Sequence, residues 1–211
     1  MKERSILFNG DMVRAILDGR KTQTRRPMKE QPHEGSKFHG MVQCFGEPRA
    51  LFWCEGQPSN YGTPLPMHVG DRFWVAETWA AVDWCNDSKP SDFGSAVWYK
   101  ADDSGPHAAA AIPYKTDKRG KWRPPIGIPR WASRIDLEIT RVWVERVQDI
   151  TDEDAKKEGV KVGEDRSYSF AEHGLKYEPH KDAFRDLWQS IYGTWDANPF
   201  VWAYEFRRVK P

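Results

Sequence analysis

The chain has 211 residues, of which 39% are hydrophobic and 30% charged, a composition typical of a globular protein and not of a fibrous one. Its 32 Lys and Arg residues nearly balance its 31 Asp and Glu residues, which excludes a cationic field over the whole chain, so a nucleic-acid site would have to be local. The sequence shows no signal-peptide pattern and no long apolar run, and its three cysteines lack metal-binding spacing. We therefore expect no membrane partner, a cytoplasmic location and reduced thiols.

The N-terminal part of the chain predicts a strand followed by a helix. An apolar run at 5–8 indicates the strand, and apolar residues at helical spacing over 12–18 indicate a helix that ends at Gly19. A strongly basic segment follows at 20–26. The composition of 27–69 then changes to Gly, Pro, His and Ser with scattered aromatics, and we interpret this range as a loop-rich insertion.

The middle of the chain predicts short strands separated by loops. Residues 72–76 and 96–100 are candidate strands, and most of 80–130 is interpreted as a second, Trp-rich insertion. Alternating apolar residues predict a further strand from 135 onward. Their parity changes near residue 140, which favours a bulge or bend of the kind that turns a corner in a small barrel.

The last part of the chain predicts two helices and a final strand. A capping-box pattern at 151–154 begins a short helix that Gly159 ends, and apolar spacing predicts a longer helix over 180–192. Alternating aromatics over 200–206 predict a strand. The order of elements indicates an α+β protein, most simply a small mixed β-barrel with helices on its rim, and we expect a single domain.

Charge is segregated along the chain. Residues 1–30 contain eight basic and four acidic residues and 119–146 contain seven and three, whereas 147–178 contain nine acidic and five basic residues. The two basic segments are candidates for one nucleic-acid groove, although solvated faces explain the same pattern. The densest run, Gly-Arg-Lys-Thr-Gln-Thr-Arg-Arg at 19–26, combines cations with two hydroxyl groups after a helix end, where anions or carbonyl oxygens are well bound.

This run resembles the G-x-K-x-x-T-x-R signature of the ASCH domain family, small β-barrels related to the PUA domains of RNA-modifying proteins. Three further segments are similar to the Gly-Asp strand, the short acidic helix and the closing strand of that family: Gly70–Glu77, Ile150–Gly159 and Asn198–Phe206. Residues 27–69 and 80–130 look like the enlargement of longer, phage-type members. The resemblance implies a PUA-like barrel that carries these two ranges as insertions.

Some ASCH proteins are amidohydrolases that remove the acyl group from N4-acylated cytidine, and their catalytic residues match Lys21, Thr24 and Glu158 here. The resemblance implies Thr24 as nucleophile, Lys21 as general base and Glu158 as proton donor to the leaving amine. Lysine serves as a base only when burial or neighbouring cations lower its pKa. On a regular strand, residues three apart point to opposite faces, so a helical turn or a bulge at 22–23 is needed to bring Lys21 and Thr24 together.

Six further residues are candidates for substrate or RNA binding: Arg20, Arg25, Arg26, Glu77, Arg130 and Trp131. Arg26 would bind a nucleobase carbonyl or an oxyanion. Glu77 is alternatively a rim carboxylate paired with a base. The loop at 122–131, rich in Trp, Arg and Pro, suits base stacking and phosphate contact, or alternatively serves as an anchored cover of the barrel. The histidines have no metal-ligand spacing, so we expect no metal and no cofactor.

Three functions fit this pattern. The leading hypothesis is recognition of RNA or a nucleoside, with hydrolysis of the amide of N4-acylated cytidine as the enzymatic form. The alternatives are a non-catalytic RNA-binding module and a phage accessory protein that binds a host protein through its aromatic insertion. A deep pocket around Lys21 would favour the enzyme, and an open basic groove would favour RNA binding.

Overall fold

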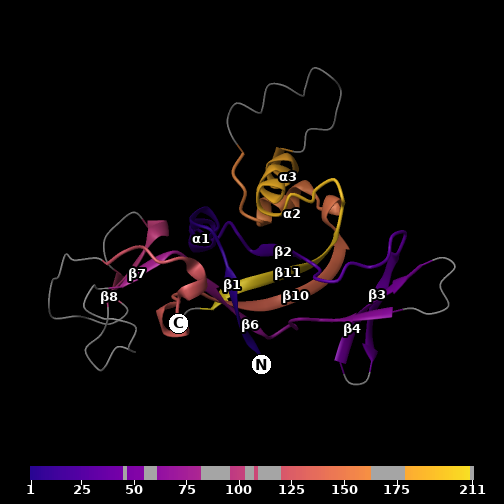
Figure 1. Cartoon of the computed structure of the whole chain (residues 1–211), viewed down its shortest axis with the longest axis horizontal. Helices are drawn as coiled ribbons and strands as arrows, with labels where there is room; N and C mark the ends of the chain where they lie inside the picture. The colour runs from indigo at the N-terminus through magenta and orange to yellow at the C-terminus, as the bar shows by residue number, and fades with distance from the viewer. Residues whose placement is uncertain are drawn as a thin grey trace, which may run out of the picture. The chain divides into compact units, whose positions relative to one another are not determined.

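The computed structural model of this chain describes residues 1–44, 47–54, 61–81, 96–102, 107–108, 120–162 and 179–209 (Figure 1). It is a mixed α+β fold built mostly from strands, as the sequence predicts. The chain forms two compact units, each of which is described by itself. The first contains Met1–Gly19, Arg72–Glu138 and Arg207–Pro211, and the second contains Arg20–Asp71 and Ile139–Phe206. The grouping of both into a single domain stays a prediction.

The first unit begins with a parallel pair of strands joined to a helix. Its elements are β1 (Glu3–Leu7), α1 (Gly10–Leu17), β6 (Arg72–Ala76) and the first residues of β10 (Asp136–Arg146). β1 pairs with β6 in parallel, and β10 pairs with β6 in antiparallel. The Asn9 side chain accepts a hydrogen bond from the Met12 N–H, which caps α1, and Gly19 with φ of 75° follows the helix end.

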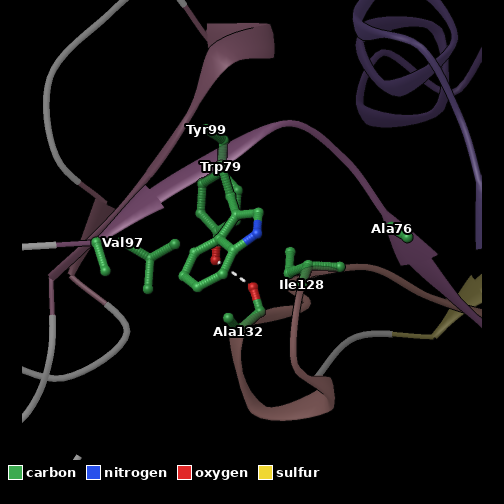
Figure 2. Packing of buried hydrophobic residues seen from close by; sticks show 7 residues of the cluster. Ala76, Trp79, Val97, Tyr99, Ile128 and Ala132 are labelled. Atoms are coloured by element: carbon green, nitrogen blue, oxygen red, sulfur yellow. Dashed lines mark hydrogen bonds between the residues drawn. The ribbon is translucent and has the colours of Figure 1, made fainter. Parts of the chain in front are cut away.

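A small antiparallel sheet and short 3₁₀ helices complete the first unit. They are β7 (Trp79–Ala81), β8 (Ala96–Tyr99), β9 (His107–Ala108), η1 (Lys100–Asp102), η2 (Pro125–Gly127) and η3 (Arg130–Ala132). Figure 2 shows how Trp79 from β7 and Tyr99 from the end of β8 pack against Ile128 and Ala132. The Tyr99 hydroxyl donates to the Ala132 carbonyl at 2.8 Å, so the loop that carries η2 and η3 is held against the sheet.

In the second unit, β10, β11 and β2 follow one another in that order in their sheet. Of these, β2 (Gln23–Pro27) and β11 (Phe200–Val209) pair in antiparallel with Thr24 opposite Tyr204. The five residues that begin β11 are all buried. Along β10, burial falls on Leu137 and Ile139 and then on Val144, so the predicted change of parity near residue 140 is confirmed.

Two helices pack together in the second unit. They are α2 (Asp152–Lys157), which follows the 3₁₀ helix η4 (Val147–Asp149), and α3 (Pro179–Tyr192). The Thr151 hydroxyl accepts from the Asp154 N–H and caps α2, and Gly159 with φ of 81° follows it, as predicted. Phe184 and Trp188 of α3 share a buried cluster with Ala155 of α2.

The prediction that 27–69 is loop-rich is wrong, whereas its interpretation as an insertion stays a prediction. These residues contain an antiparallel sheet of β3 (Lys37–Cys44), β4 (Glu47–Trp53) and β5 (Tyr61–Pro64). A register shift between Phe38 and Gly40 interrupts the alternation that would have revealed β3. Phe52 is fully buried and packs edge-on against Phe200 at 5.0 Å, so this sheet belongs to the core of the second unit. Much of the second predicted insertion, 80–130, lies outside the described residues.

The strand pairings within the described ranges do not close a ring, so the PUA-like barrel stays a prediction. No helix in the described parts of the chain has the length and apolarity that crossing a membrane requires.

Candidate functional site

The basic segment at the start of the second unit lies against the C-terminal end of α2. At the helix end, Arg20 Nη1 binds the Gly159 carbonyl at 3.3 Å and the Thr22 N–H binds the Lys157 carbonyl at 2.8 Å. Gln23 Nε2 binds Asp154 Oδ1, in the first turn of the same helix, at 3.1 Å. The last carbonyl groups of a helix lack partners within the helix and carry partial negative charge. A cationic segment is therefore well placed at this end.

Lys21 is fully buried and makes three hydrogen bonds at this helix end. Its Nζ lies 2.6 Å from Glu158 Oε2, 2.9 Å from the Glu158 carbonyl oxygen and 2.8 Å from the Gln23 carbonyl oxygen. These three acceptors match the three N–H donors of an ammonium group. Glu158 is 3% exposed, so the Lys21–Glu158 ion pair is shielded from water. The structure thus brings together two of the three predicted catalytic residues.

Arg25 binds the other oxygen of the same carboxylate. Its Nη1 lies 3.2 Å from Glu158 Oε1, and its Nε lies 2.6 Å from Glu145 Oε1. The third nitrogen, Nη2, lies 3.7 Å from Asp154 Oδ2 and is a buried donor without a hydrogen bond to any described residue. The Arg25 guanidinium also lies 5.6 Å from the centre of the Trp143 ring. Glu158 is therefore held between two cations, one on each oxygen.

Burial lowers the pKa of Lys21 below its ordinary value of 10.5. The Glu158 carboxylate favours the protonated form, and the positive charges of Arg26 and Arg25 oppose it, but the loss of hydration is the largest effect. A lysine with a lowered pKa can release its proton more easily, and the nearest acceptor is 2.6 Å away on Glu158.

Thr24 lies in β2 and is 3% exposed. Lys21 precedes β2, which begins at Gln23, so the alternation of a regular strand does not extend to Lys21. Its Nζ reaches the Gln23 carbonyl, whose carbon is bonded to the nitrogen of Thr24. The Lys21 side-chain nitrogen therefore lies beside the Thr24 backbone. Before it can accept a proton from the Thr24 hydroxyl, the ammonium group must first lose one of its own protons.

The other two arginines of the signature differ in exposure. Arg20 is exposed, whereas Arg26 is half-buried and donates from Nη1 to the Tyr192 hydroxyl at 2.9 Å. Alternation along β2 puts Arg26 on the same face as Thr24, and puts Arg25 with Gln23 on the other face. Arg26 is thus the signature arginine that shares a face with the predicted nucleophile. Substrate binding by Arg20, Arg25 and Arg26 stays a prediction.

Glu77 belongs to the first unit, where it forms a second buried ion-pair cluster. Its two oxygens lie 2.8 and 2.9 Å from Nε and Nη2 of Arg134, and the same guanidinium makes two hydrogen bonds to Asp102. The guanidinium also lies 4.0 Å from the centre of the Tyr99 ring. The alternative interpretation of Glu77, a carboxylate paired with a base, is the arrangement that the structure shows.

The pKa values of this second cluster shift away from neutrality. Burial alone would lower the pKa of Arg134, but its hydrogen bonds with Glu77 and Asp102 raise that pKa above its ordinary value. Burial raises the pKa of Tyr99 to about 12. Arg134 and Tyr99 therefore both stay protonated under physiological conditions.

The last two predicted binding residues also lie in the first unit. Arg130 is exposed and ion-paired with Glu3 at 3.3 Å and Asp136 at 3.0 Å. Trp131 is 39% exposed, and its ring meets Trp79 edge-on at 6.4 Å. Binding of substrate or RNA by either residue stays a prediction.

Sequence reasoning missed the carboxylates that surround Arg25. Asp154 lies four residues before Glu158, a spacing that puts both side chains on one face of a helix, and this signal was present in the sequence. Glu145 lies on β10, more than a hundred positions from Arg25, and no local pattern connects the two.

In the described parts of the chain, no group of three His, Cys, Asp or Glu side chains is arranged to hold a metal ion. Comparisons of the chain with protein families, with curated proteins and with solved structures find no match. The ASCH resemblance therefore rests on the sequence motifs alone.

Proposed function

We propose that the second unit hydrolyses the amide of an N4-acylated cytidine, with Thr24 as nucleophile, Lys21 as general base and Glu158 as general acid. The observation that supports this proposal best is the buried contact of 2.6 Å between Lys21 Nζ and Glu158 Oε2. It joins a base whose pKa is lowered by burial to a carboxylate that can hold the transferred proton. The resemblance to amidohydrolases of the ASCH family supports the substrate class.

The acylation step begins with transfer of a proton from the Lys21 ammonium to Glu158, which leaves a neutral amine. The amine takes the proton of the Thr24 hydroxyl while the Thr24 oxygen forms a bond to the acyl carbon of the substrate. As the bond from that carbon to the N4 nitrogen breaks, Glu158 gives its proton to the nitrogen. The products of this step are cytidine and an ester on Thr24, and the ammonium and carboxylate are restored.

The deacylation step uses the same pair in the opposite direction. A water molecule attacks the ester carbon and gives a proton to the Glu158 carboxylate, while the Lys21 ammonium returns a proton to the Thr24 oxygen as the ester bond breaks. The carboxylic acid leaves, and a proton passes from Glu158 back to Lys21. Each group therefore ends in its initial state, and no cofactor enters the reaction.

Arg26 is the residue best placed to assist at the substrate carbonyl. It shares a face of β2 with Thr24, and its guanidinium is half-buried near the Tyr192 hydroxyl. Donors held in place next to the nucleophile stabilise the negative charge that develops on an acyl oxygen. Arg25, in contrast, is occupied by Glu145 and Glu158, so we assign it to holding Glu158 in position.

The test is turnover of N4-acetylcytidine by the whole chain, followed by chromatography of the released cytidine. Glu158→Gln and Thr24→Ala should each abolish turnover, whereas the matched exposed controls Glu153→Gln and Thr140→Ala should leave it unchanged. Mass spectrometry of the wild-type protein during turnover should detect one acetyl group on Thr24. Absence of turnover on every acylated cytidine tested, or full activity of Thr24→Ala, would contradict the proposal.

A further inference from the structure

A loop of the first unit, Trp122–Trp131, carries three large apolar side chains at its surface. Trp122 and Trp131 are each 39% exposed, and Ile126 is 83% exposed. Single exposed apolar residues are common on proteins, but a group of exposed aromatic and aliphatic side chains on one loop is typical of a binding surface. The proposed amide hydrolysis in the second unit does not use this loop.

The Trp122–Trp131 loop is anchored to the first unit by its other residues. Arg123 exchanges both backbone hydrogen bonds with Trp79 of β7, at 2.8 and 3.3 Å. Ile128 and Ala132 are buried in the cluster around Trp79 (Figure 2). Ile128 is therefore the buried anchor of the loop, and the two tryptophans stay partly in solvent.

Proline makes this loop stiff. Pro124, Pro125 and Pro129 lie within it, and the residues that precede its two 3₁₀ helices are Pro124 with φ of −66° and Pro129 with φ of −75°. A loop whose backbone is already ordered loses little conformational entropy when a partner binds. The exposed indoles therefore lie on a loop whose backbone is ordered before a partner binds.

The charge around the loop favours an anionic partner. Residues 118–135 contain six Lys or Arg residues and no Asp or Glu. Two of these cations, Arg130 and Arg134, form ion pairs with carboxylates of the same unit. Lys121 is exposed directly beside Trp122, and the Arg123 guanidinium lies 5.2 Å from the centre of the Trp79 ring.

We propose that the Trp122–Trp131 loop is a stacking platform for single-stranded nucleic acid. Each exposed indole would stack a base, and Lys121 would contact a phosphate. Flat aromatic faces next to cations match the alternation of bases and phosphates in a single strand, whereas an acidic peptide would use the cations and leave the indoles without a partner. This proposal is independent of the amide hydrolysis proposed above.

The test measures the fluorescence anisotropy of labelled oligouridine and oligothymidine RNA and DNA strands with the whole chain. The double variant Trp122→Ala, Trp131→Ala should weaken binding about tenfold or more. The matched control is Trp53→Ala, which removes a tryptophan that is 44% exposed on β4 of the second unit and should bind as wild type. Trp131→Phe retains a ring for stacking and for the contact with Trp79, so it should lose less affinity than Trp131→Ala.

Two further measurements separate base stacking on this loop from binding at the basic segment of the second unit. Lys121→Ala should reduce the slope of log affinity against log salt by about 0.7, the value for one phosphate contact on a single strand. Arg20→Ala, which removes an exposed cation of that basic segment, should bind the oligonucleotides as wild type if the strand lies on the loop. Three outcomes would overturn the proposal. They are the absence of binding to either strand, wild-type affinity in the double Trp variant, and displacement of the strand by a polyglutamate peptide that binds the same tryptophans more tightly.

Discussion

The two units each contain a buried cluster of cations and carboxylates, and the clusters differ in one respect. In the first unit, Arg134 binds Glu77 and Asp102 through a guanidinium that stays charged, and Tyr99 beside it keeps its proton because its pKa is raised to about 12. In the second unit, Glu158 is bound by Arg25 and also by Lys21, whose pKa is lowered by burial. Arg134 and Tyr99 therefore hold their protons more firmly than usual, whereas burial makes the proton of Lys21 easier to release.

Burial and ion pairing are common to both clusters, so they do not by themselves distinguish a catalytic site from a structural one. A buried arginine with two carboxylates holds them in place, because removal of the arginine leaves buried carboxylates without a counter-charge. A buried lysine with one carboxylate adds the ability to change protonation state. The experiments below test whether this chemical distinction corresponds to a functional one.

The largest expected effect is on turnover after Lys21→Arg. Arginine retains the positive charge beside Glu158 but does not release its proton, so it cannot act as a base. We expect turnover of N4-acetylcytidine to fall about a thousandfold, within the range contributed by general base catalysis. Arg134→Lys is the matched change in the first unit and should leave the turnover number close to that of the wild type. Steady-state kinetics of both variants check this, and equal losses would erase the distinction between the clusters.

The next effect is on stability after Arg134→Met. The substitution leaves Glu77, which is 2% exposed, without its cation, and should lower the free energy of unfolding by about 4 kcal/mol. Adding Glu77→Leu to the same variant should recover much of this loss. Arg130→Met removes an exposed ion pair and should cost less than about 1 kcal/mol. Urea denaturation measures all three, and a small effect of Arg134→Met would show that the first cluster does not need its charge.

The two clusters should give opposite dependences of stability on pH. Tyr99 has its pKa raised from 10.0 to about 12, so the stability it contributes is complete below pH 10 and is lost as the pH rises through 12, about 3 kcal/mol in all. Lys21 has its pKa lowered from 10.5, so the unfolded chain binds more protons than the folded chain between the lowered value and 10.5, and stability rises with pH in that interval. Unfolding curves over alkaline pH for the wild type, Tyr99→Phe and Lys21→Met measure both slopes. In Tyr99→Phe, the fall of stability between pH 10 and 12 should disappear. In Lys21→Met, the rise of stability with pH should disappear.

The smallest effect compares two helix caps. Asn9 caps α1 in the first unit and Thr151 caps α2 in the second, each through one hydrogen bond to a backbone N–H. Replacing either with alanine should cost about 1 kcal/mol of stability. Only Thr151→Ala should also reduce turnover, because α2 positions Glu158. A reduction of turnover by Asn9→Ala of the same size would show that general loss of stability accounts for both.

Local signals in the sequence were sufficient for the helices and for several strands. The spacing of apolar residues and the signals at Gly19, Thr151 and Gly159 lie within a few residues of the elements that they begin or end, so α1, α2 and α3 were predictable. The sheet of β3, β4 and β5 was missed because a strand is stabilised by partners on other strands, and the shift at Gly40 hides its alternation. The candidate site was predictable at Lys21, Thr24 and Glu158 only through the ASCH resemblance.

The amino-acid sequence by itself determined the presence and approximate place of the three helices, the α+β character of the fold and the concentration of cations at 19–26, since each depends on neighbours along the chain. The tertiary structure decided which cation meets which carboxylate. Lys21 and Glu158 are 137 positions apart, and Arg134 and Glu77 are 57 apart. The strength of an ion pair and the pKa of a buried lysine depend on distance in space and on exclusion of water, and both are established only when the chain has folded.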